Sequence, residues 1–538
     1  MKNLFPGKEK KLRIGVFTRD PEKLDNWENR IIKTVLEHPN LELCLFVRNS
    51  GKSAYNSSLN AVLSIQMKIE SLVFKKPQTV DPAEITEQTK DIETICMNPV
   101  REGSFDVFSE EDTAKVKEYN LDIILQLEFS ALSGSILQAA RYGIWSFYHS
   151  GVADNRVRLA GFSETVKNEP FHTVMLHDGK NIIDRACLNL YWSFFRANND
   201  LLENSVALLL KNINRLLRQG AVETGEPISQ YLFSGKNPGL NHTFIYLFKF
   251  YSSVFQRILC KFFPVKRLNC WALFLGRGNF LEKDLSALNP AAMPKDVFWA
   301  DPFLYRHENQ LYVFFEAYPY KTGKGKLSAG RVVEEGNERY KVTDVVDILD
   351  LKYHLSYPQI FEEDGQVFLM PETYQNKRLE VYRCTHFPEK WELYSTAFTG
   401  EEMVDTTYFR DDNGERWLFL NKGWTFDSEL HIYKIDSLKM ENITAHASNP
   451  VILDCRLARS GGVIFRLGNE VYRPSQINTH GIYGKGLQIS RIKKLTLDEF
   501  EYEPAAEIYP VFRKGLTGMH HLHQYENNFV FDGCFKKL

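Results

Sequence analysis

The sequence predicts an α/β domain followed by an all-β domain, a five-bladed β-propeller. The chain has 538 residues, more than one hydrophobic core usually organises, so at least two domains are expected. Short apolar runs alternate with helical patterns over the first 220 residues, whereas the second half repeats pairs of short aromatic-rich strands. We therefore expect an α/β domain over 1–225, a helical connector over 226–268 and the propeller over 269–538.

Composition excludes several classes of protein. Lys and Arg number 66 against 68 Asp and Glu, so the whole chain has no electrostatic attraction to nucleic acid. A hydrophobic content of 43% with 25% charged residues is typical of a folded globular protein and argues against disorder or multiple membrane spans. Aromatic residues reach 13%, which favours strands and surfaces that contact sugars. We expect no nucleic-acid partner.

The cysteines indicate whether a metal site is expected, and the first residues of the chain indicate its cellular location. The eight cysteines lie far apart, without Cys-x-x-Cys and without His at zinc-ligand spacing, so no metal site is predicted. Residues 1–12 are rich in lysine and no apolar run follows them, so no secretory signal is expected. These observations predict a cytoplasmic protein, with the inner face of a membrane as an alternative position. The sequence gives no indication of the oligomeric state.

The α/β domain is predicted from its apolar periods. Strands are expected over 13–17 and 42–46, and the helical pattern between them predicts a right-handed βαβ unit. Two more strands, over 121–126 and 142–147, should flank a helix over 134–141. An amphipathic helix over 199–218 should end at Gly220.

The connector has an unusual charge pattern. Between Glu226 and Glu282 the sequence has no acidic residue and seven basic ones. Residues 240–263 suit a helix with a narrow polar stripe and a wide apolar face, and this helix carries too many charges to span a bilayer comfortably. Two interpretations follow: the helix lies in a membrane surface, or its apolar face packs between the flanking domains.

The remaining sequence is a weak repeat of five units. Each unit has a short strand, a turn with Asp, Asn or Gly, and an aromatic-rich strand. Equivalent positions are 48 to 60 residues apart, which is typical of propeller blades. The units begin at Ala300, Ser356, Asp405, Ser460 and His520.

The repeat also predicts where polar residues gather. In an antiparallel pair, the start of one strand lies beside the end of the next. The residues at the start of each first strand and at the end of each second strand should therefore converge on one face, unless they serve to cap turns or to bond neighbouring blades. They are Asp301, Ser356, Asp405, Arg459 and His520 at the starts, and Glu316, Glu372, Asn421, Arg473 with Gln476, and Asp532 at the ends.

These residue types suit carbohydrate chemistry. Carboxyl groups serve as acid, base or hydroxyl-binding groups, and arginine suits phosphate, carboxylate or nucleotide-sugar groups. The candidate catalytic residues are Asp301, Asp405, Glu372 and Glu316. The candidate substrate-binding residues are His354, Tyr357, Arg459, Arg473, Gln476 and His520.

Asp301-Pro302, Ser356-Tyr-Pro358 and Asp405 resemble the five-bladed propellers of family 43-type glycoside hydrolases. The resemblance implies a general base at Asp301 and a residue that tunes a pKa at Asp405. That family has a Glu as the acid at the start of the fourth blade, where this sequence reads Ala458-Arg459-Ser460-Gly461. An arginine cannot supply the proton, so Glu316 or Glu372 would have to replace that acid.

A longer resemblance covers most of the second half. Its motifs include Trp299-Ala-Asp-Pro-Phe303, His354-Leu-Ser-Tyr-Pro358, Met370-Pro-Glu372 and Tyr472-Arg-Pro-Ser-Gln476. These resemble the N-terminal propeller domain of plant glucosamine inositolphosphorylceramide transferases. The resemblance implies the fold, while the glycosyltransfer chemistry of the plant enzymes is expected from a different domain.

The first 220 residues resemble the Rossmann-like N-terminal domain of methionyl-tRNA and sugar N-formyltransferases, through 121–125, 136–143 and 178–181. That family uses Asn-x-His and an Asp with formyl-tetrahydrofolate. Here those three positions read Ser146, Tyr148 with His149 beside it, and Asn181. An Asn cannot act as a carboxylate base, although a shifted set of His149 with Asp154 or Asp184 is an alternative. The resemblance thus favours a scaffold that has lost or changed its chemistry.

Together these observations predict a carbohydrate-active protein of glycan biosynthesis or modification. Its site would lie on the propeller face and perform glycosyl transfer, hydrolysis or glycan binding. One alternative is an amino-sugar N-formyltransferase, with formyl-tetrahydrofolate as cofactor and the propeller holding the acceptor glycan. Another alternative makes both domains recognition modules, with residues 240–263 at a membrane surface.

Overall fold

The computed structural model describes residues 11–50, 60–74, 76–103, 105–127, 129, 131–149, 157–231, 239–262, 270–336 and 339–535. The chain divides into two compact units, Met1–Ser253 and Val254–Leu538. This division falls within helix α7 (Leu240–Phe262), inside the segment predicted as a connector.

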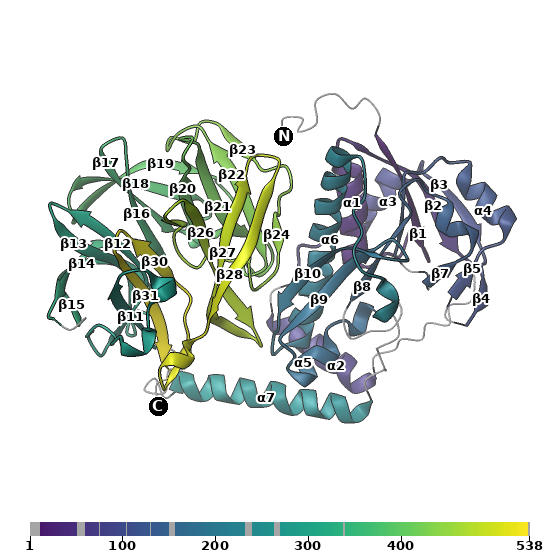
Figure 1. Cartoon of the computed structure of the whole chain (residues 1–538). Helices are drawn as coiled ribbons and strands as arrows, with labels where there is room; N and C mark the ends of the chain where they lie inside the picture. Colours follow the sequence, from purple (N-terminus) through teal and green to yellow (C-terminus); the bar gives the residue numbers. More distant parts are fainter. Residues whose placement is uncertain are drawn as a thin grey trace. The chain divides into compact units, whose positions relative to one another are not determined.

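The first unit is built on a seven-stranded sheet with the order β10-β9-β8-β6-β1-β2-β3 (Figure 1). The five strands from β8 to β3 are parallel, and β9 and β10 continue the sheet antiparallel. The predicted βαβ unit is confirmed, since α1 connects the parallel pair β1 and β2. The parallel part has the order of a doubly wound sheet. The strands are β1 (Leu12–Thr18), β2 (Leu41–Asn49), β3 (Glu93–Met97), β6 (Ile123–Gln126), β8 (Ile144–His149), β9 (Phe171–His177) and β10 (Ile182–Asn189).

Helices and a small sheet complete this unit. The predicted helix over 199–218 is confirmed as α6 (Phe194–Gln219), which ends at Gly220 with a φ of +71°. The helix predicted over 134–141 is wrong, because only a 3-10 turn over Ser135–Gln138 forms and Ala140 already pairs with Leu121 as extended chain. The other elements are α1 (Asn26–Glu37), α2 (Ala61–Val73), α3 (Pro82–Thr89), α4 (Glu110–Lys117), α5 (Phe162–Lys167), and the sheet of β4 (Val100–Glu102), β5 (Phe105–Val107) and β7 (Ala131–Ser133).

The second unit forms five antiparallel sheets over its described residues, which confirms the predicted five-bladed propeller (Figure 1). First strands of adjacent blades contact each other, and aromatic pairs such as Phe303 with Tyr357 pack between blades. Blades 1 and 2 are β12 (Val297–His307), β13 (Gln310–Pro319), β14 (Lys326–Glu334), β15 (Tyr340–Leu349), then β16 (Ser356–Glu363), β17 (Gln366–Glu372), β18 (Leu379–His386) and β19 (Lys390–Ala397). Blades 3 and 4 are β20 (Val404–Arg410), β21 (Arg416–Lys422), β22 (Glu429–Ile435), β23 (Ile443–Ala445), β24 (Ile452–Leu453), then β25 (Phe465–Leu467), β26 (Glu470–Thr479), β27 (Ile482–Leu495) and β28 (Phe500–Ile508).

Blade 5 combines the two ends of the second unit. It contains β29 (Leu516–Gly518), β30 (Leu522–Tyr525), β31 (Asn528–Phe535) and also β11 (Cys270–Arg277), the first strand of the unit. β11 pairs along its whole length with β31. This pairing closes the ring of blades, because one blade contains strands from both ends of the unit.

Candidate functional site

The first strands of blades 1, 2 and 3 share one irregularity. The register of each strand shifts at the same repeat position, and the residue at the shift has a left-handed backbone. These residues are Asp301, Tyr357 and Asp405, with φ of +49°, +48° and +47°. A left-handed backbone costs a non-glycine residue about 1–2 kcal/mol, so its repetition requires contacts that hold it.

Hydrogen bonds between neighbouring blades supply these contacts. In each, a buried side-chain oxygen accepts a backbone N–H from the segment that begins the next blade. The bonds join Asp532 to Asp301 N (3.1 Å), Asp301 to Tyr357 N (3.2 Å), Glu372 to Asp405 N (3.2 Å) and Asn421 to Ser460 N (3.0 Å). Four of the predicted polar positions therefore bond neighbouring blades, which was one of the interpretations left open by the sequence.

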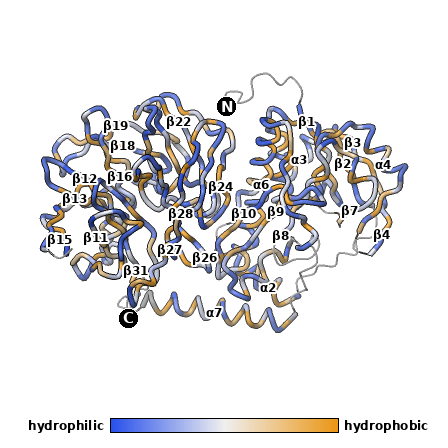
Figure 2. The backbone as a smooth tube through the Cα atoms, viewed as in Figure 1, coloured by the Kyte–Doolittle hydropathy of each residue, from blue (hydrophilic) through white to orange (hydrophobic). Residues whose placement is uncertain are grey.

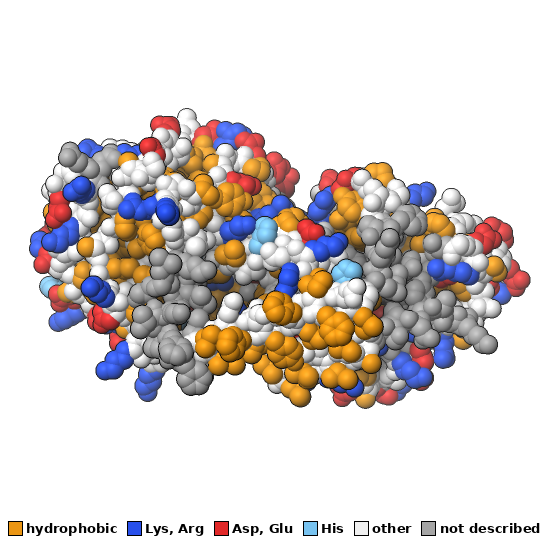
Figure 3. Space-filling model, turned by 90° about the horizontal axis from the view of Figure 1, so that it is seen from below, with side chains coloured by type: hydrophobic (Ala, Val, Ile, Leu, Met, Phe, Trp, Pro, Cys, Tyr) orange, Lys and Arg blue, Asp and Glu red, His pale blue; other side chains and the backbone are white. Residues whose placement is uncertain are grey.

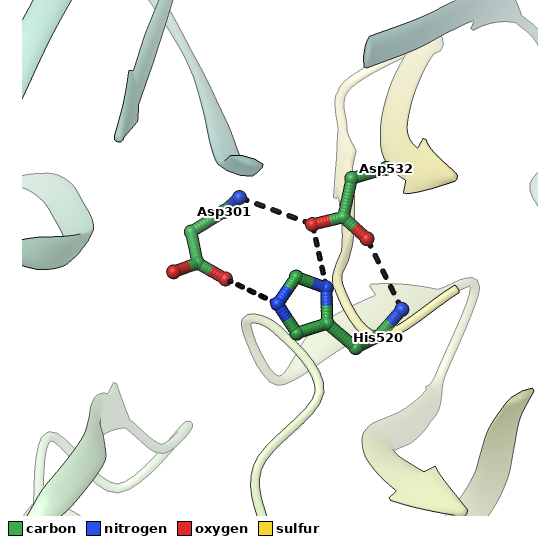
Figure 4. A group of neighbouring side chains, drawn as sticks. All are labelled: Asp301, His520 and Asp532. Atoms are coloured by element: carbon green, nitrogen blue, oxygen red, sulfur yellow. Dashed lines mark hydrogen bonds and ion pairs between the residues drawn. The ribbon is translucent and has the colours of Figure 1, made fainter. Parts of the chain in front are cut away.

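His520 lies between two carboxylates (Figure 4). Its Nδ1 is 2.7 Å from Asp532 Oδ2, its Nε2 is 3.4 Å from Asp301 Oδ1, and its ring stacks on Trp271 at 4.0 Å between centroids. Burial alone would lower the pKa of His520, but Asp532 and Asp301 raise it above its usual value. Burial raises the pKa of Asp301 to about 7, with His520 acting in the opposite direction.

The same three residues offer donor atoms of the kinds that bind metals. Among the described residues they are the one group whose ligand atoms lie within 4.8 Å of one another. Both oxygens of Asp532 already accept backbone N–H groups, from Asp301 and from His520 and His521. The raised pKa of His520 favours its protonated form, and an imidazolium has no lone pair for a metal. The group therefore fits a buried ion-paired triad better than a cation site.

Asp405 is held by two side chains from blade 4. Arg459 Nε lies 2.6 Å from Asp405 Oδ2, and Gln476 Nε2 donates to the same oxygen at 3.0 Å. Arg473 has another partner, since it donates to the backbone oxygens of Leu457 and Ala458 and its burial lowers its pKa to about 10. These hydrogen bonds of Arg473 stabilise the segment that carries Arg459.

Glu316 and Glu372 are the remaining carboxyl groups of the site, and both are buried. Burial raises the pKa of each well above its usual value, and the nearby carboxylates Asp301 and Asp405 add to the shift. Glu316 Oε1 lies 3.6 Å from His354 Nε2. Gly325 N donates to His354 Nδ1, so the neutral imidazole carries its proton on Nε2, toward Glu316.

Three residues form the more exposed part of the site. The side chains of Arg459 and His354 are 15% and 22% exposed, and Tyr483 is 43% exposed with its ring 4.8 Å from the Arg459 guanidinium carbon. Because the carboxyl groups are buried, a ligand would meet these three side chains first. The arrangement offers carboxyl groups with raised pKa behind an arginine and an aromatic ring, which suits a hydroxyl-rich or anionic ligand.

Sequence reasoning missed two members of this site, Tyr483 and Trp271. Asp532 was predicted to converge with the other polar residues on one face, but it was not among the candidate catalytic or binding residues. Trp271 lies on β11, outside the repeats, so no local pattern indicates its contact with His520.

In the first unit, the structure does not bring the formyltransferase-type candidates together. Tyr148 and His149 end β8, whereas Asn181 lies in the turn between β9 and β10. His177, at the end of β9, pairs with Ser146, so the turn that follows continues toward the start of β8 and away from His149. Asp154, in the shifted set, lies outside the described residues.

The environments of these candidates are those of a packed core. His149 Nε2 lies 2.9 Å from Ser205 Oγ, and burial together with His177 lowers the pKa of His149 to about 3. Burial would raise the pKa of Asp184, but Lys211 at 3.0 Å outweighs it and lowers the pKa. Tyr148 is buried in a small apolar cluster. These groups therefore have separate partners within the α/β unit.

The comparisons with known proteins bear on the propeller. Residues 286–515 match the family described as "Glucosamine inositolphosphorylceramide transferase 1, N-terminal". Proteins named glucosamine inositolphosphorylceramide transferase 1 match in Oryza sativa subsp. japonica, 32% identical over 213 residues, and in Arabidopsis thaliana, 29% identical over 234 residues. The matches cover 38% and 42% of this chain, but only 28% and 30% of those relatives. The predicted resemblance of the propeller to this domain is confirmed.

Solved propellers are also similar to this chain. CoXyl43, a GH43 β-xylosidase/α-arabinofuranosidase from a compost microbial metagenome, is 14% identical with a TM-score of 0.33, over 44% of this chain and 86% of its own. An α-L-arabinanase of Cellvibrio cellulosa is 14% identical with a TM-score of 0.33, over 46% and 89%.

The comparisons correct one prediction. The relatives are transferases named for inositolphosphorylceramide, a ceramide-based membrane lipid, and this contradicts the predicted cytoplasmic location. Within the described parts of the chain, no helix combines the length and hydropathy needed to cross a membrane.

Proposed function

We propose that this chain is a glycan-modifying enzyme whose reacting groups lie in the propeller. One observation carries the proposal: four buried carboxyl groups from three blades influence one another, and their surroundings differ. Asp405 is ion-paired with Arg459, while burial raises the pKa of Asp301, Glu316 and Glu372. Carboxyl groups in contrasting environments are what acid and base catalysis at a glycosidic bond requires.

Glu316 is the best candidate for the proton donor. Glu372 and Asp301 each use an oxygen to bond the backbone of the next blade, whereas none of the bonds between blades uses Glu316. Glu316 faces His354, which is one of the more exposed residues of the site. Glu316 would then serve as the proton donor for a leaving oxygen, in place of the family 43-type acid, whose sequence position holds Arg459 here. Asp405, held by Arg459 and Gln476, is the candidate for stabilising positive charge on the sugar ring.

The substrate class follows from the same residues. Arg459 and Tyr483 present a cation and an aromatic ring, which suits a sugar that carries a phosphate or another anionic group. The relatives are named for such a compound, a glucosamine-bearing inositolphosphorylceramide. We propose glycosyl transfer to, or hydrolysis of, a phosphate-bearing glycan of this type.

The test compares Glu316→Gln and Asp405→Asn with the control Asp364→Asn, whose side chain is exposed in a hairpin turn of blade 2. A glycan array with glucosamine-containing and inositol-phosphate-linked members identifies the ligand, and turnover is then measured on that ligand. We expect each site variant to lose at least about 100-fold in kcat/KM, and the control to keep the wild-type value. Wild-type kcat/KM in both site variants would contradict the proposal.

The proposal does not extend to the first unit. His149, Asn181 and Asp184 lie in separate surroundings, and an N-formyltransferase would need them around one formyl-tetrahydrofolate. Titration of the full chain with formyl-tetrahydrofolate tests this alternative: saturable binding that His149→Ala removes would favour it.

A further inference from the structure

Helix α2 and the part of α7 that belongs to the first unit, residues 240–253, expose apolar side chains on one surface, which we call the α2–α7 face. Its most exposed members are Leu72 on α2 and Phe248 on α7, at 84% and 76%. Figure 3 shows hydrophobic side chains gathered along α7 and beside it. The exposed residues are Val62, Ile65, Ile69, Leu72 and Val73 on α2, and Leu240, Phe244, Ile245, Phe248 and Tyr251 on α7.

The polarity of α2 is the reverse of that of an ordinary surface helix. Gln66 and Glu70 point inward and are buried, at 3% and 0% exposure, while Ile65, Ile69 and Leu72 point outward. A helix at a water-facing surface normally buries its apolar stripe and exposes its polar residues. The reversed pattern indicates that the outward face of α2 is suited to an apolar environment.

The buried polar residues fix this face in place. Glu70 accepts hydrogen bonds from Ser193 Oγ at 2.6 Å and from Phe195 N at 3.1 Å, at the start of α6, and also from the Tyr246 hydroxyl of α7. Gln66 Oε1 accepts from Tyr251 OH at 2.9 Å. Because these bonds join α2, α6 and α7, the two exposed helices lie side by side with defined orientations.

The apolar stripe continues along α7. Its exposed apolar residues recur at intervals of three or four, at 240, 244, 248, 251, 255 and 258, which places them on one side of the helix. Figure 2 shows hydrophobic positions recurring over the length of α7. The stripe is therefore longer than the contact of α7 with α2.

The charges beside the stripe indicate what covers it. Lys68 on α2 and Lys249 and Arg257 on α7 are exposed, and the sequence has no acidic residue between Glu226 and Glu282. Basic residues beside an exposed apolar stripe are typical of helices that lie in the headgroup region of an anionic membrane. A twofold contact between two copies would instead bring the same basic residues together, where they repel.

We propose that the α2–α7 face docks onto the surface of an anionic lipid bilayer. The apolar side chains of both helices enter the boundary between headgroups and acyl chains, and the flanking lysines and arginine contact anionic headgroups. This inference does not depend on the carboxyl groups of the propeller. It favours one of the two interpretations of 240–263, the interfacial helix, and adds a second helix, α2, for which sequence reasoning made no such prediction.

Flotation of the full chain with vesicles tests the proposal. The vesicles contain phosphatidylcholine alone or phosphatidylcholine with phosphatidylserine. We expect wild-type protein to float with the anionic vesicles and to bind the neutral ones at least about tenfold more weakly. The variant Leu72→Ser with Phe248→Ser should lower binding to anionic vesicles at least about tenfold, since two large side chains no longer enter the membrane.

A matched control removes two other exposed apolar side chains, with Val100→Ser and Val511→Ser, at 65% and 90% exposure. It should float as the wild type does. A second face variant, Ile65→Ser with Phe244→Ser, repeats the test should the first fold poorly. Asp405→Asn should leave flotation unchanged, so a failure of the proposed enzymatic function is separable from a failure here.

Three results would overturn the proposal. Wild-type protein that stays with the soluble fraction, face variants that float as wild type, or equal binding to neutral and anionic vesicles each contradict it. Light scattering is a second measurement. A wild-type dimer that the face variants convert to a monomer, without any lipid binding, would make the α2–α7 face an interface between copies.

Discussion

Asp301 combines a structural and a chemical role in one side chain. Its backbone adopts a left-handed conformation at the strand irregularity, held by Asp532, and its own carboxyl group accepts the backbone N–H of Tyr357 in the next blade. Full burial beside other carboxylates raises its pKa to about 7. The backbone bonds that build the ring of blades therefore also place a titratable group where water cannot easily stabilise its charge.

This burial makes stability depend on pH. The pKa of Asp301 in the folded chain is about 7, above its ordinary value of 3.8, so the folded state binds this proton more tightly than the unfolded state does. The contribution of Asp301 to stability therefore decreases as pH rises from about 4 to about 7, by up to about 4 kcal/mol, and is constant outside that window. We expect Asp301→Asn to reduce the fall in the free energy of unfolding across this window.

Denaturant unfolding at several pH values between about 4 and 8 measures the effect. The exposed Asp364→Asn serves as the control and should follow the wild-type pH dependence. An Asp301→Asn variant with the same slope as the wild type would show that Asp301 does not carry this proton. His520 changes stability in the same direction, since the stability from its raised pKa is fully present below the ordinary value of 6.5 and is lost as pH rises from there through the folded pKa.

For single residues, the sequence predicted which positions lie together better than it predicted which groups each side chain contacts. The repeat predicted that Asp301, Glu316, Glu372 and Asp405 share one region, because equivalent positions of a repeat recur in space. It could not predict that Arg473 binds the oxygens of Leu457 and Ala458, because that depends on the path of the chain before blade 4.

Among the elements, local patterns predicted structure and long-range pairings were missed. The hairpins of the blades follow from turn residues between aromatic-rich runs, so each was predicted from a short window. The pairing of β11 with β31 joins segments about 250 residues apart, and no local pattern specifies it. The same pairing brings Trp271 to His520, which explains why the sequence also missed that contact.

Gly484, near the start of β27, lies against His520 of blade 5. A Cβ at Gly484 would lie 2.6 Å from the Cβ of His520, and Gly484 has a φ of +59°. We expect Gly484→Ala to displace His520 from Asp301 and Asp532, to lower stability by about 2 kcal/mol or more, and to lower activity.

Gly468→Ala is the matched control for this change. Gly468 has nearly the same backbone, with a φ of +60°, but no atom lies within 4 Å of its Cβ position. Its free energy of unfolding should fall by about 1 kcal/mol, from backbone strain alone, and its activity should stay at the wild-type value. Thermal unfolding and the pH profile of activity separate the two variants, and equal effects in both would contradict the role of the close approach.

For the whole molecule, division into two kinds of domain was the most predictable feature. Periodicity changes between the two halves, and this change follows from the different packing of parallel and antiparallel sheets. The outward apolar face of α2 could not be predicted in the same way. A helical period shows that one face is apolar, but not whether that face is buried by the protein or left outside.

The two proposals together predict different kinetics of the whole chain on a glycolipid embedded in vesicles and on a soluble glycan. If the α2–α7 face holds the chain on a membrane, a glycolipid embedded in vesicles is presented at a raised local concentration, whereas a soluble glycan gains nothing. Leu72→Ser with Phe248→Ser should therefore raise KM at least about tenfold for the embedded glycolipid and leave kcat/KM unchanged for the soluble glycan. Glu316→Gln should lower kcat for both substrates, because it removes a proton that either leaving oxygen needs. If the face variant slowed the soluble reaction as well, its effect would come from the fold of the first unit, and membrane presentation would not explain it.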